Sequence, residues 1–307
     1  MDLRQLRYLV TVADEGGIRK ASRRLRLTQP SLSQALRQLE DELGVELVRR
    51  SPRGAELTTA GAELVEHARE ILARADAARS AMRRRAEQRS CTLKVGLLAG
   101  VIAAGELTAP IVERFHRERP DVDVQLHDIG FFDQAAPLLN GEVDVALIRA
   151  PLIDRRIELV PLALDPRLVL AGATHELAGL ERVGIDEIMD ERMVPVVAPD
   201  YFSAFWHLDD YRGRPNVDPA MAPAKTVADL QFAVATGRTI MIAASVTARV
   251  LPNGLLRPVA VSGLSPSLIA AARVRTDRRR VVHDFIHAAV ETAVSRIEVL
   301  PGGALPA

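Results

Sequence analysis

A leucine repeat near the start of the chain constrains its fold more than any other feature. Four leucines recur at spacings of four, three and four residues, and therefore lie on one face of a helix: Leu32, Leu36, Leu39 and Leu43. Thr28 is a good N-cap for this helix, and Pro30 in the first turn needs no N–H partner. Gly44 stops the helix. The repeat therefore predicts a helix over residues 28–43 with one buried face.

The opposite face of this helix has the composition of a DNA-reading surface. Its outward residues are short polar or basic ones: Gln29, Ser31, Ser33, Gln34, Arg37 and Gln38. No Asp or Glu occurs between Thr28 and Leu39. A helix in the major groove must bury one face on its own domain and present such side chains on the other. Gln pairs with adenine edges and Arg with guanine edges, so the pattern predicts a recognition helix.

The flanking segments complete a winged helix-turn-helix over residues 1–58. Two shorter helices precede the recognition helix, one ending at Gly16 and one running from Ile18 to about Leu25. Extended segments at 46–49 and 55–58 flank a hairpin tip that carries Arg50 and Arg53, which are placed to reach a minor groove or the backbone. The alternative is a solvated polar helix in a small all-α domain. The predicted contacts with double-stranded DNA are Thr28, Gln29, Pro30, Ser31, Ser33, Gln34, Arg37, Arg50 and Arg53.

A long helix is predicted next, over residues 59–89. Its apolar positions alternate between spacings of three and four residues and are mostly small, which is typical of a coiled-coil seam. A helix with one narrow seam and charges elsewhere needs a partner helix. We therefore expect a homodimer that forms through Gly61 and the positions Leu64, Ala68, Ile71, Ala75, Ala78 and Met82.

From Cys91 onward, short β-rich segments alternate with helical patterns. This alternation predicts a largely parallel sheet with helices on both faces, and so an α/β domain over residues 90–307. The alternation is interrupted near Asp165 and near Pro266, which indicates two lobes with two chain crossings. Lobe 1 would hold residues 91–164 and 267–301, and lobe 2 residues 165–266. A cleft between lobes is a common small-molecule site.

Charge and composition agree with a basic DNA-binding head on an acidic body. Lys and Arg outnumber Asp and Glu by 18 to 13 through Ser90, and are outnumbered 22 to 27 after it. Cys91 is the single cysteine, which excludes an internal disulfide and a Cys-rich zinc site. The chain has neither a signal-peptide core nor a run of about 20 apolar residues. We therefore expect a cytoplasmic protein with no membrane partner.

Catalysis is the competing class of function, and the sequence gives it little support. His283, His287 and Glu291 share one helix face, but no fourth metal ligand is evident. Asp144 could pair with Asp123 or Asp128, although strand ends often carry such acids. No nucleophile elbow, phosphate-binding loop or metalloprotease motif occurs. The chain is therefore not expected to be an enzyme or to bind a metal or cofactor.

The segment from Ala21 to Gly61, ASRRLRLTQPSLSQALRQLEDELGVELVRRSPRGAELTTAG, resembles the N-terminal domain of LysR-type transcriptional regulators. The resemblance continues more weakly through GEVDVALI, THELA and AVATGRTIMIAAS. It implies a two-lobed effector domain like that of periplasmic binding proteins. It also implies antiparallel linker helices in a dimer, pairing of dimers into a tetramer, and a DNA site that is an interrupted inverted repeat. RNA polymerase is a further candidate partner.

The resemblance places an effector between the lobes, near Gly100, Val101, Gly130, Phe131, Asp200, Tyr201 and Thr226. Family members often have Ser or Thr after the first sensor strand, where a carboxylate is held, but residues 98–101 are Leu-Ala-Gly-Val. Phe131 and Phe132 add bulk at the next strand end. These departures favour an apolar or aromatic effector or a narrowed pocket. The alternative is a DNA-binding regulator without a small-molecule effector, with a collapsed cleft or with control by a partner protein or by redox state.

Overall fold

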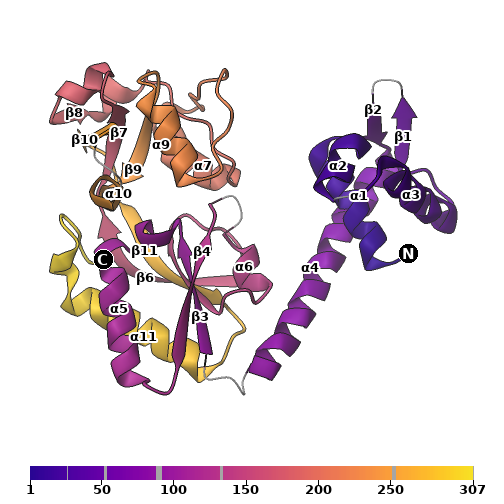
Figure 1. Ribbon diagram of the computed structural model, residues 1–307, viewed down its shortest axis with the longest axis horizontal. Helices are drawn as coiled ribbons and strands as arrows, with labels where there is room; N and C mark the ends of the chain where they lie inside the picture. The colour runs from indigo at the N-terminus through magenta and orange to yellow at the C-terminus, as the bar shows by residue number, and fades with distance from the viewer. Residues whose placement is uncertain (26, 52–53, 88–91, 132–133, 251–253, 307) are drawn as a thin grey trace. The chain divides into compact units, whose positions relative to one another are not determined.

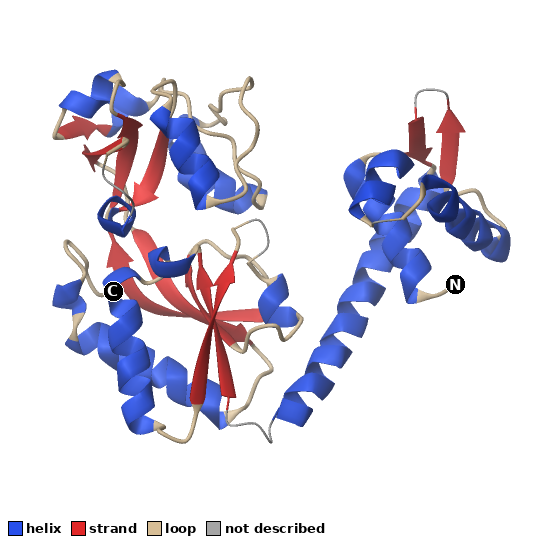
Figure 2. Ribbon diagram, in the orientation of Figure 1, coloured by secondary structure: helices blue, strands red, loops and turns tan. Residues whose placement is uncertain are grey.

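The computed structural model describes residues 1–25, 27–51, 54–87, 92–131, 134–250 and 254–306. The chain forms two units, Met1–Met82 and Arg83–Ala307 (Figure 1). The first unit is mostly helical, whereas helices and strands are mixed in the second (Figure 2). No helix of the described chain combines the length and the apolar character needed to cross a bilayer.

The first unit begins with three helices and a hairpin, as predicted. The helices are α1 (Leu3–Glu15), α2 (Ile18–Arg24) and α3 (Gln29–Leu43), and the antiparallel hairpin joins β1 (Val48–Ser51) to β2 (Gly54–Leu57). The predicted strand start at Glu46 is two residues early. Glu40 explains the difference. Its Oε1 accepts the N–H groups of Leu47 and Val48 at 2.9 Å each, so these residues are bound to α3 at the point where pairing of β1 with β2 begins.

The leucine face of α3 is buried over three of its four predicted positions. Leu32, Leu36 and Leu39 are all 0% exposed in a core shared with α1, α2 and the start of β1. Leu43 was predicted on the same face but is 39% exposed. Its position explains this, because α3 ends at Gly44, whose φ of 69° reverses the chain beyond the edge of the core.

The first turns of α4 (Thr59–Glu87) belong to the core of the head. Ala68, which was predicted to contact a partner helix, is 0% exposed. Leu64 packs against the core that α1, α2 and α3 share. Gly61 lies against the backbone carbonyl of Leu47. The predicted seam is therefore available to a partner only from Ile71, which is 38% exposed, through Ala75 to Ala78. The side chain of Met82 lies outside the described residues.

Lobe 1 contains a five-stranded sheet in the order β4-β3-β5-β11-β6. Its strands are β3 (Thr92–Leu98), β4 (Asp123–Ile129), β5 (Val145–Arg149), β6 (Ile157–Asp165) and β11 (Ser267–Val274). The first three are parallel, as predicted, but β11 is antiparallel to β5 and β6 because it enters after the chain returns from lobe 2.

Three helices accompany this sheet: α5 (Thr108–Glu118), α6 (Ala136–Leu139) and α11 (Arg280–Ser295). α5 and α11 lie side by side (Figure 1), and the rings of Phe115 and Phe285 meet edge to face at 5.3 Å. α6 begins at Ala136, which places Pro137 in its first turn, where a proline is accepted in a helix.

Lobe 2 contains a four-stranded sheet in the order β8-β10-β7-β9. Its strands are β7 (Arg167–Gly172), β8 (Arg182–Gly184), β9 (Ile240–Ala244) and β10 (Leu256–Ser262). β7 is antiparallel to both neighbours, so the prediction of a largely parallel sheet is wrong for this lobe. The apolar residues 193–197 do not form a strand, and Met193 and Val196 take part only in isolated bridges. Pro195 lies between them and has no N–H for a ladder.

The helices of lobe 2 are α7 (Asp200–His207), α8 (Asp209–Arg212), α9 (Val227–Ala235) and α10 (Ser245–Val250). The capping box predicted for α9 is present, with the N–H of Asp229 donating to the Thr226 hydroxyl at 3.1 Å and the Asp229 carboxylate accepting the N–H of Thr226 at 3.0 Å. The sequence patterns did not predict β6, α7, α8, α10 or β10.

The candidate catalytic groups have structural roles. Asp144 is paired with Arg279 at 2.7 Å and accepts the N–H of Lys94 at 2.8 Å, which ties β5 to β3. His283 contacts the Arg273 guanidinium at 2.8 Å. Within the described part of the chain, no cluster of three or more His, Cys, Asp or Glu could hold a metal ion. Cys91 lies outside the described residues.

The contact of Gly61 with the start of the hairpin gives the first prediction. Gly→Ala in an unconstrained helix usually stabilises a protein by up to about 1 kcal/mol. Here the added Cβ would meet the Leu47 carbonyl oxygen, so Gly61→Ala should instead destabilise the head by about 1–3 kcal/mol. Hydrogen exchange of the α1–α3 amides in the full chain measures this change.

The exposed neighbour Ala62 provides a matched control, because Ala62→Ser adds an atom on the solvent side of the same turn. Slower exchange in Gly61→Ala than in the unaltered chain would contradict the packing described for this turn.

Candidate nucleic-acid interface and ligand cavity

The face of α3 opposite the buried leucines is open to solvent and carries no acid from Gln29 to Gln38, although the exposed Asp41 and Glu42 follow in the last turn. Six of the predicted contact residues are exposed: Thr28, Gln29, Pro30, Ser31, Gln34 and Arg37. Gln38 is exposed with them, and Ser33 is half-buried. This surface therefore combines a rigid helix with donors and acceptors that suit base edges and phosphates.

The start of α3 is fixed by its own cap. The Thr28 hydroxyl lies 2.8 Å from Ser31 Oγ and accepts the Ser31 N–H at 3.3 Å. The Thr28 hydroxyl oxygen is thus engaged within the helix. Pro30 has no N–H and the Leu32 N–H donates to the Thr28 carbonyl at 3.1 Å, so the Gln29 N–H is the described first-turn group that remains for an anion. Arg50 lies in β1 rather than at the hairpin tip, and its side chain lies outside the described residues. Arg53 also lies outside them.

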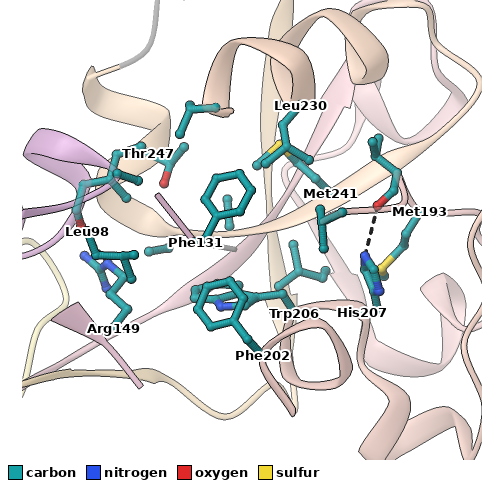
Figure 3. Close-up of a pocket in the computed structure, with 18 residues that line it drawn as sticks. Leu98, Phe131, Arg149, Met193, Phe202, Trp206, His207, Leu230, Met241 and Thr247 are labelled. Atoms are coloured by element: carbon teal, nitrogen blue, oxygen red, sulfur yellow. Dashed lines mark hydrogen bonds between the residues drawn. The ribbon is translucent and has the colours of Figure 1, made fainter. Parts of the chain in front are cut away.

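An apolar cavity of about 100 Å³ lies between the two lobes of the second unit (Figure 3). Lobe 1 contributes residues from β3, the loop after β4, and β5, and lobe 2 contributes residues from α7, α9, β9 and α10. The lining residues are Leu98, Ala99, Ile102, Phe131, Arg149, Met193, Val194, Val196, Phe202, Trp206, His207, Val227, Leu230, Met241, Ile242, Ala243, Ala244 and Thr247.

A wider outer pocket of about 400 Å³ adjoins this inner cavity and shares Ala99, Ile102, Phe131 and Val227 with it. The outer pocket is more polar, since Asp128 and Lys225 line it. Phe131 lies at the boundary between the two spaces.

The structure places four of the seven predicted effector residues at these cavities: Gly100, Gly130, Phe131 and Thr226. Asp200 and Tyr201 line neither, contrary to the sequence-based placement. The register of α7 explains this, because Phe202 and Trp206 are four residues apart and turn inward, which leaves Asp200 exposed at the first turn. The side chain of Val101 lies outside the described residues.

Several lining residues were missed by sequence reasoning, among them Arg149, Phe202, Trp206, His207 and Thr247. The apolar pair at four-residue spacing in DYFSAFWH was the available signal for Phe202 and Trp206. Nothing in the sequence marked Arg149, because its position at the cavity depends on the two lobes meeting beside β5.

Aromatic contacts join the lobes across the inner cavity. The Phe131 ring of lobe 1 stacks on the Phe202 ring of lobe 2, with centroids 6.4 Å apart and planes within 9°. Phe202 in turn lies 6.0 Å from Trp206. Figure 3 shows these rings on the floor and at the centre of the cavity. Stacked pairs of this kind add about 0.5–1.5 kcal/mol beyond area burial, so they favour the closed arrangement of the lobes.

A buried ion pair lies beside the same cavity, where the chain crosses between the lobes. Arg149 Nη2 is 2.8 Å from Asp165 Oδ2, and the two side chains are 3% and 0% exposed. Arg149 also donates to Ser267 Oγ at 2.8 Å and to the Ile102 carbonyl at 2.7 Å. Burial lowers the pKa of the Arg149 guanidinium, and the Asp165 carboxylate opposes that shift.

Lobe 2 completes this network. The Ser245 hydroxyl, at the start of α10, donates to Asp165 Oδ1 at 2.6 Å. Arg249, one turn later, donates to Ser245 Oγ at 3.0 Å and to Glu106 Oε2 of lobe 1 at 3.0 Å. The network therefore connects both chain crossings and one wall of the cavity.

His207 lies on the far wall of the cavity and is 7% exposed. Its Nε2 is 3.0 Å from the Val194 carbonyl (Figure 3). Burial lowers the pKa of the imidazole, although the hydrogen bond to Val194 acts in the opposite direction. The ring is therefore neutral at pH 7 and donates through Nε2 to the carbonyl.

Two family models match the chain and together cover most of it. The model described as "Bacterial regulatory helix-turn-helix protein, lysR family" matches residues 3–62, and "LysR substrate binding domain" matches residues 86–294. The HTH-type transcriptional regulator AlsR of Bacillus subtilis is 32% identical over 221 residues, which are 71% of this chain and 72% of AlsR. BudR of Raoultella terrigena, also a regulator, is 28% identical over 93% of this chain and 99% of its own length.

Solved structures show the same fold at lower identity. A full-length BenM variant has a TM-score of 0.54 at 23% identity and covers 100% of this chain and 99% of its own. Full-length CbnR complexed with its target DNA has a TM-score of 0.50 at 23% identity, over 95% of this chain and 100% of its own. AlsR and BudR are transcriptional regulators, which agrees with the expectation that this chain is not an enzyme.

The lowered pKa of His207 predicts a pH dependence of stability. The folded chain keeps the imidazole neutral below the ordinary histidine pKa of about 6.5, so the unfolded chain binds the proton first. The free energy of unfolding should therefore fall as pH drops below about 6.5. His207→Gln, which keeps a donor for the Val194 carbonyl, should show a shallower loss of melting temperature between pH 7.5 and 5.5.

His287 is exposed, and His287→Gln serves as the matched control with an unchanged pH profile. Burial raises the pKa of the nearby Asp209 carboxyl. Asp209 is present in both proteins, so the difference between His207→Gln and the unaltered chain reports the contribution of His207 to the pH dependence. Equal slopes for His207→Gln and the unaltered chain would refute a buried neutral imidazole at this position.

Proposed function

The chain belongs to the LysR family of bacterial transcriptional regulators, and we propose that it reads DNA through the exposed face of α3 under the control of a small molecule bound between its two lobes. One observation carries the DNA part of this proposal. Three fully buried leucines fix the rotation of α3, so the polar side chains of residues 29–38, none of them acidic, are held toward solvent. An unanchored polar helix would not present these side chains in a fixed register.

The side chains divide by the part of DNA that they suit. Gln34 and Arg37 are long enough to reach base edges, whereas Ser31 and the free first-turn N–H suit phosphates. Arg50 and Arg53 of the hairpin are proposed to contact the backbone or a flanking minor groove. The full set of proposed DNA contacts is Thr28, Gln29, Pro30, Ser31, Ser33, Gln34, Arg37, Arg50 and Arg53.

A second copy of the head is proposed to come from dimerisation of α4. Ile71 and Ala78 are exposed on a helix whose earlier seam positions serve the core of the head. Two heads in a symmetric dimer suit an inverted repeat with an interruption between its half-sites. We extend the proposal to pairing of dimers into a tetramer, to contact with RNA polymerase, and to a cytoplasmic location.

The domain division that we propose is a head at 1–58, a linker helix at 59–89 and an effector domain at 90–307. The linker begins inside the first unit, since Gly61 lies against the Leu47 carbonyl and Leu64 packs on the core of the head. A regulator that senses nothing is less favoured, because spaces of about 100 and 400 Å³ persist between the lobes. Redox control by an internal disulfide would need a second cysteine, and Cys91 is the only one.

Arg37→Ala tests the DNA-reading face. If Arg37 pairs with a guanine edge, its loss should cost about 1–3 kcal/mol on a DNA fragment that the protein selects from a random-sequence pool. Fluorescence anisotropy at fixed salt measures the affinity for that fragment and for a scrambled one. The specific affinity should fall by more than the non-specific affinity.

Arg4 on α1 has an exposed side chain and is not one of the proposed DNA contacts, so Arg4→Ala is the matched control with little effect on either fragment. Equal loss on the selected and scrambled fragments would make Arg37 a phosphate contact. Unchanged affinity on both would remove α3 from the interface.

Ile71→Asp tests the proposed helix pairing. A charge at an apolar seam position should dissociate the dimer, since an unpaired carboxylate would be buried between helices. Sedimentation velocity of the full chain should show a shift from dimer to monomer. Ile71→Leu, which keeps the volume, should leave the dimer intact. A dimer that persists in Ile71→Asp would place the contact elsewhere.

A further inference from the structure

We propose that the inner cavity binds a small uncharged molecule with a hydrogen-bond acceptor oxygen, such as a short ketone, aldehyde or alcohol, and that it rejects carboxylates. This inference rests on the proposed function, because it names the chemical class of the controlling molecule. It is carried by three features of the cavity: its charge balance, its unpartnered hydroxyl and its size.

The charge balance is neutral despite the arginine in the wall. Arg149 is paired with Asp165 at 2.8 Å, and the nearby Arg249 is paired with Glu106. These two cations and two anions cancel, so no excess positive charge faces the cavity. A carboxylate entering this space would lose its hydration and compete with Asp165 for Arg149, which makes its burial unfavourable.

One polar side chain at the cavity offers a donor to a ligand acceptor. Thr247 is 3% exposed and lines the cavity, and its hydroxyl forms no hydrogen bond with the described residues. Trp206 also lines the cavity, but its Nε1–H is covered by protein atoms and does not open into it. A donor left unpaired away from water is unfavourable. A ligand carbonyl or hydroxyl oxygen supplies an acceptor for the Thr247 hydroxyl, whereas a hydrocarbon leaves it unpaired.

His207 does not offset this preference for an acceptor. Its Nε2 is occupied by the Val194 carbonyl, and its ring is neutral, so it brings no cation to the cavity. The rest of the lining is aliphatic or aromatic, with Leu98, Ile102, Leu230 and Met241 among its members. One polar end and an apolar body therefore describe the complementary molecule.

The size of the cavity limits that body. The inner space of about 100 Å³ is smaller than an engineered cavity of roughly 150 Å³ that binds benzene. Phe131, which stacks on Phe202, lines both the inner cavity and the outer pocket. A compact molecule of a few carbon atoms fits without separating these rings.

Three probes of equal size and similar shape test the proposal: butan-2-one, propionate and 2-methylbut-1-ene. The first has a neutral acceptor, the second carries a charge, and the third has no acceptor. Saturation-transfer NMR titrations on the full chain should give a Kd for butan-2-one about tenfold lower than for either of the others, the change expected from pairing one buried donor. Tighter binding of propionate, or no binding of butan-2-one, would overturn the proposal.

Thr247→Val removes the hydroxyl at nearly constant volume. It should weaken butan-2-one binding several-fold and leave 2-methylbut-1-ene unchanged. Thr236, at the exposed end of α9, lines neither cavity, so Thr236→Val is the matched control. An equal effect of Thr247→Val on both probes would contradict the acceptor contact.

Failure here is separable from failure of the proposed function. The probe titrations involve no DNA, and the Arg37→Ala experiment involves no small molecule. If the chain binds DNA but prefers propionate, the proposed regulatory function stands and the proposed ligand class is wrong. If the chain binds butan-2-one selectively but does not bind DNA, the ligand class stands and the proposed function is wrong.

Discussion

Burial of the leucine face of α3 decides what the first unit can do. Leu32, Leu36 and Leu39 are fully buried, and each such side chain contributes about 1.5–3 kcal/mol relative to exposure. A helix turned by one residue would expose these leucines and bury Ser33 and Arg37 instead. The free energy of packing therefore also fixes which side chains of α3 face solvent.

The hairpin is held by the same helix. Glu40, on the last turns of α3, accepts two backbone N–H groups at the start of β1, and Gly61 allows α4 to approach the Leu47 carbonyl. The recognition helix, the hairpin and the beginning of the linker are thus one packed body. A dimer contact further along α4 would position this body as a whole.

In the second unit, the corresponding constraint is the Arg149–Asp165 pair at the lobe crossings. Burying such a pair is unfavourable unless its other hydrogen bonds are met, and here Ser245, Ser267 and the Ile102 carbonyl provide them. Because these partners come from both lobes, a change in the lobe angle would break part of the network. The cavity wall that holds Arg149 is therefore mechanically linked to the hinge, which is the requirement for a ligand to alter the domain.

Much of this could be predicted from the sequence where the pattern is local. The capping of α3 by Thr28 and of α9 by Thr226, and the burial of three leucines, follow from spacing within a single helix. Asp200 and Tyr201 were misplaced because the register of α7 depends on which lobe it packs against. Ala68 was assigned to a partner helix because periodicity shows that a face is apolar but not what covers it. The position of Arg149 at the cavity depends on residues more than 100 positions apart, such as Ser267, and no local pattern records that contact.

The central claim is that occupancy of the interlobe cavity and DNA binding are thermodynamically linked. The most direct test is the affinity of the full chain for its selected DNA fragment, measured with and without a saturating neutral ligand of the inner cavity. Linkage predicts a change of about 5-fold or more, in either direction, and a reciprocal change in ligand affinity when DNA is bound. An unchanged DNA affinity with the cavity demonstrably filled would contradict the account.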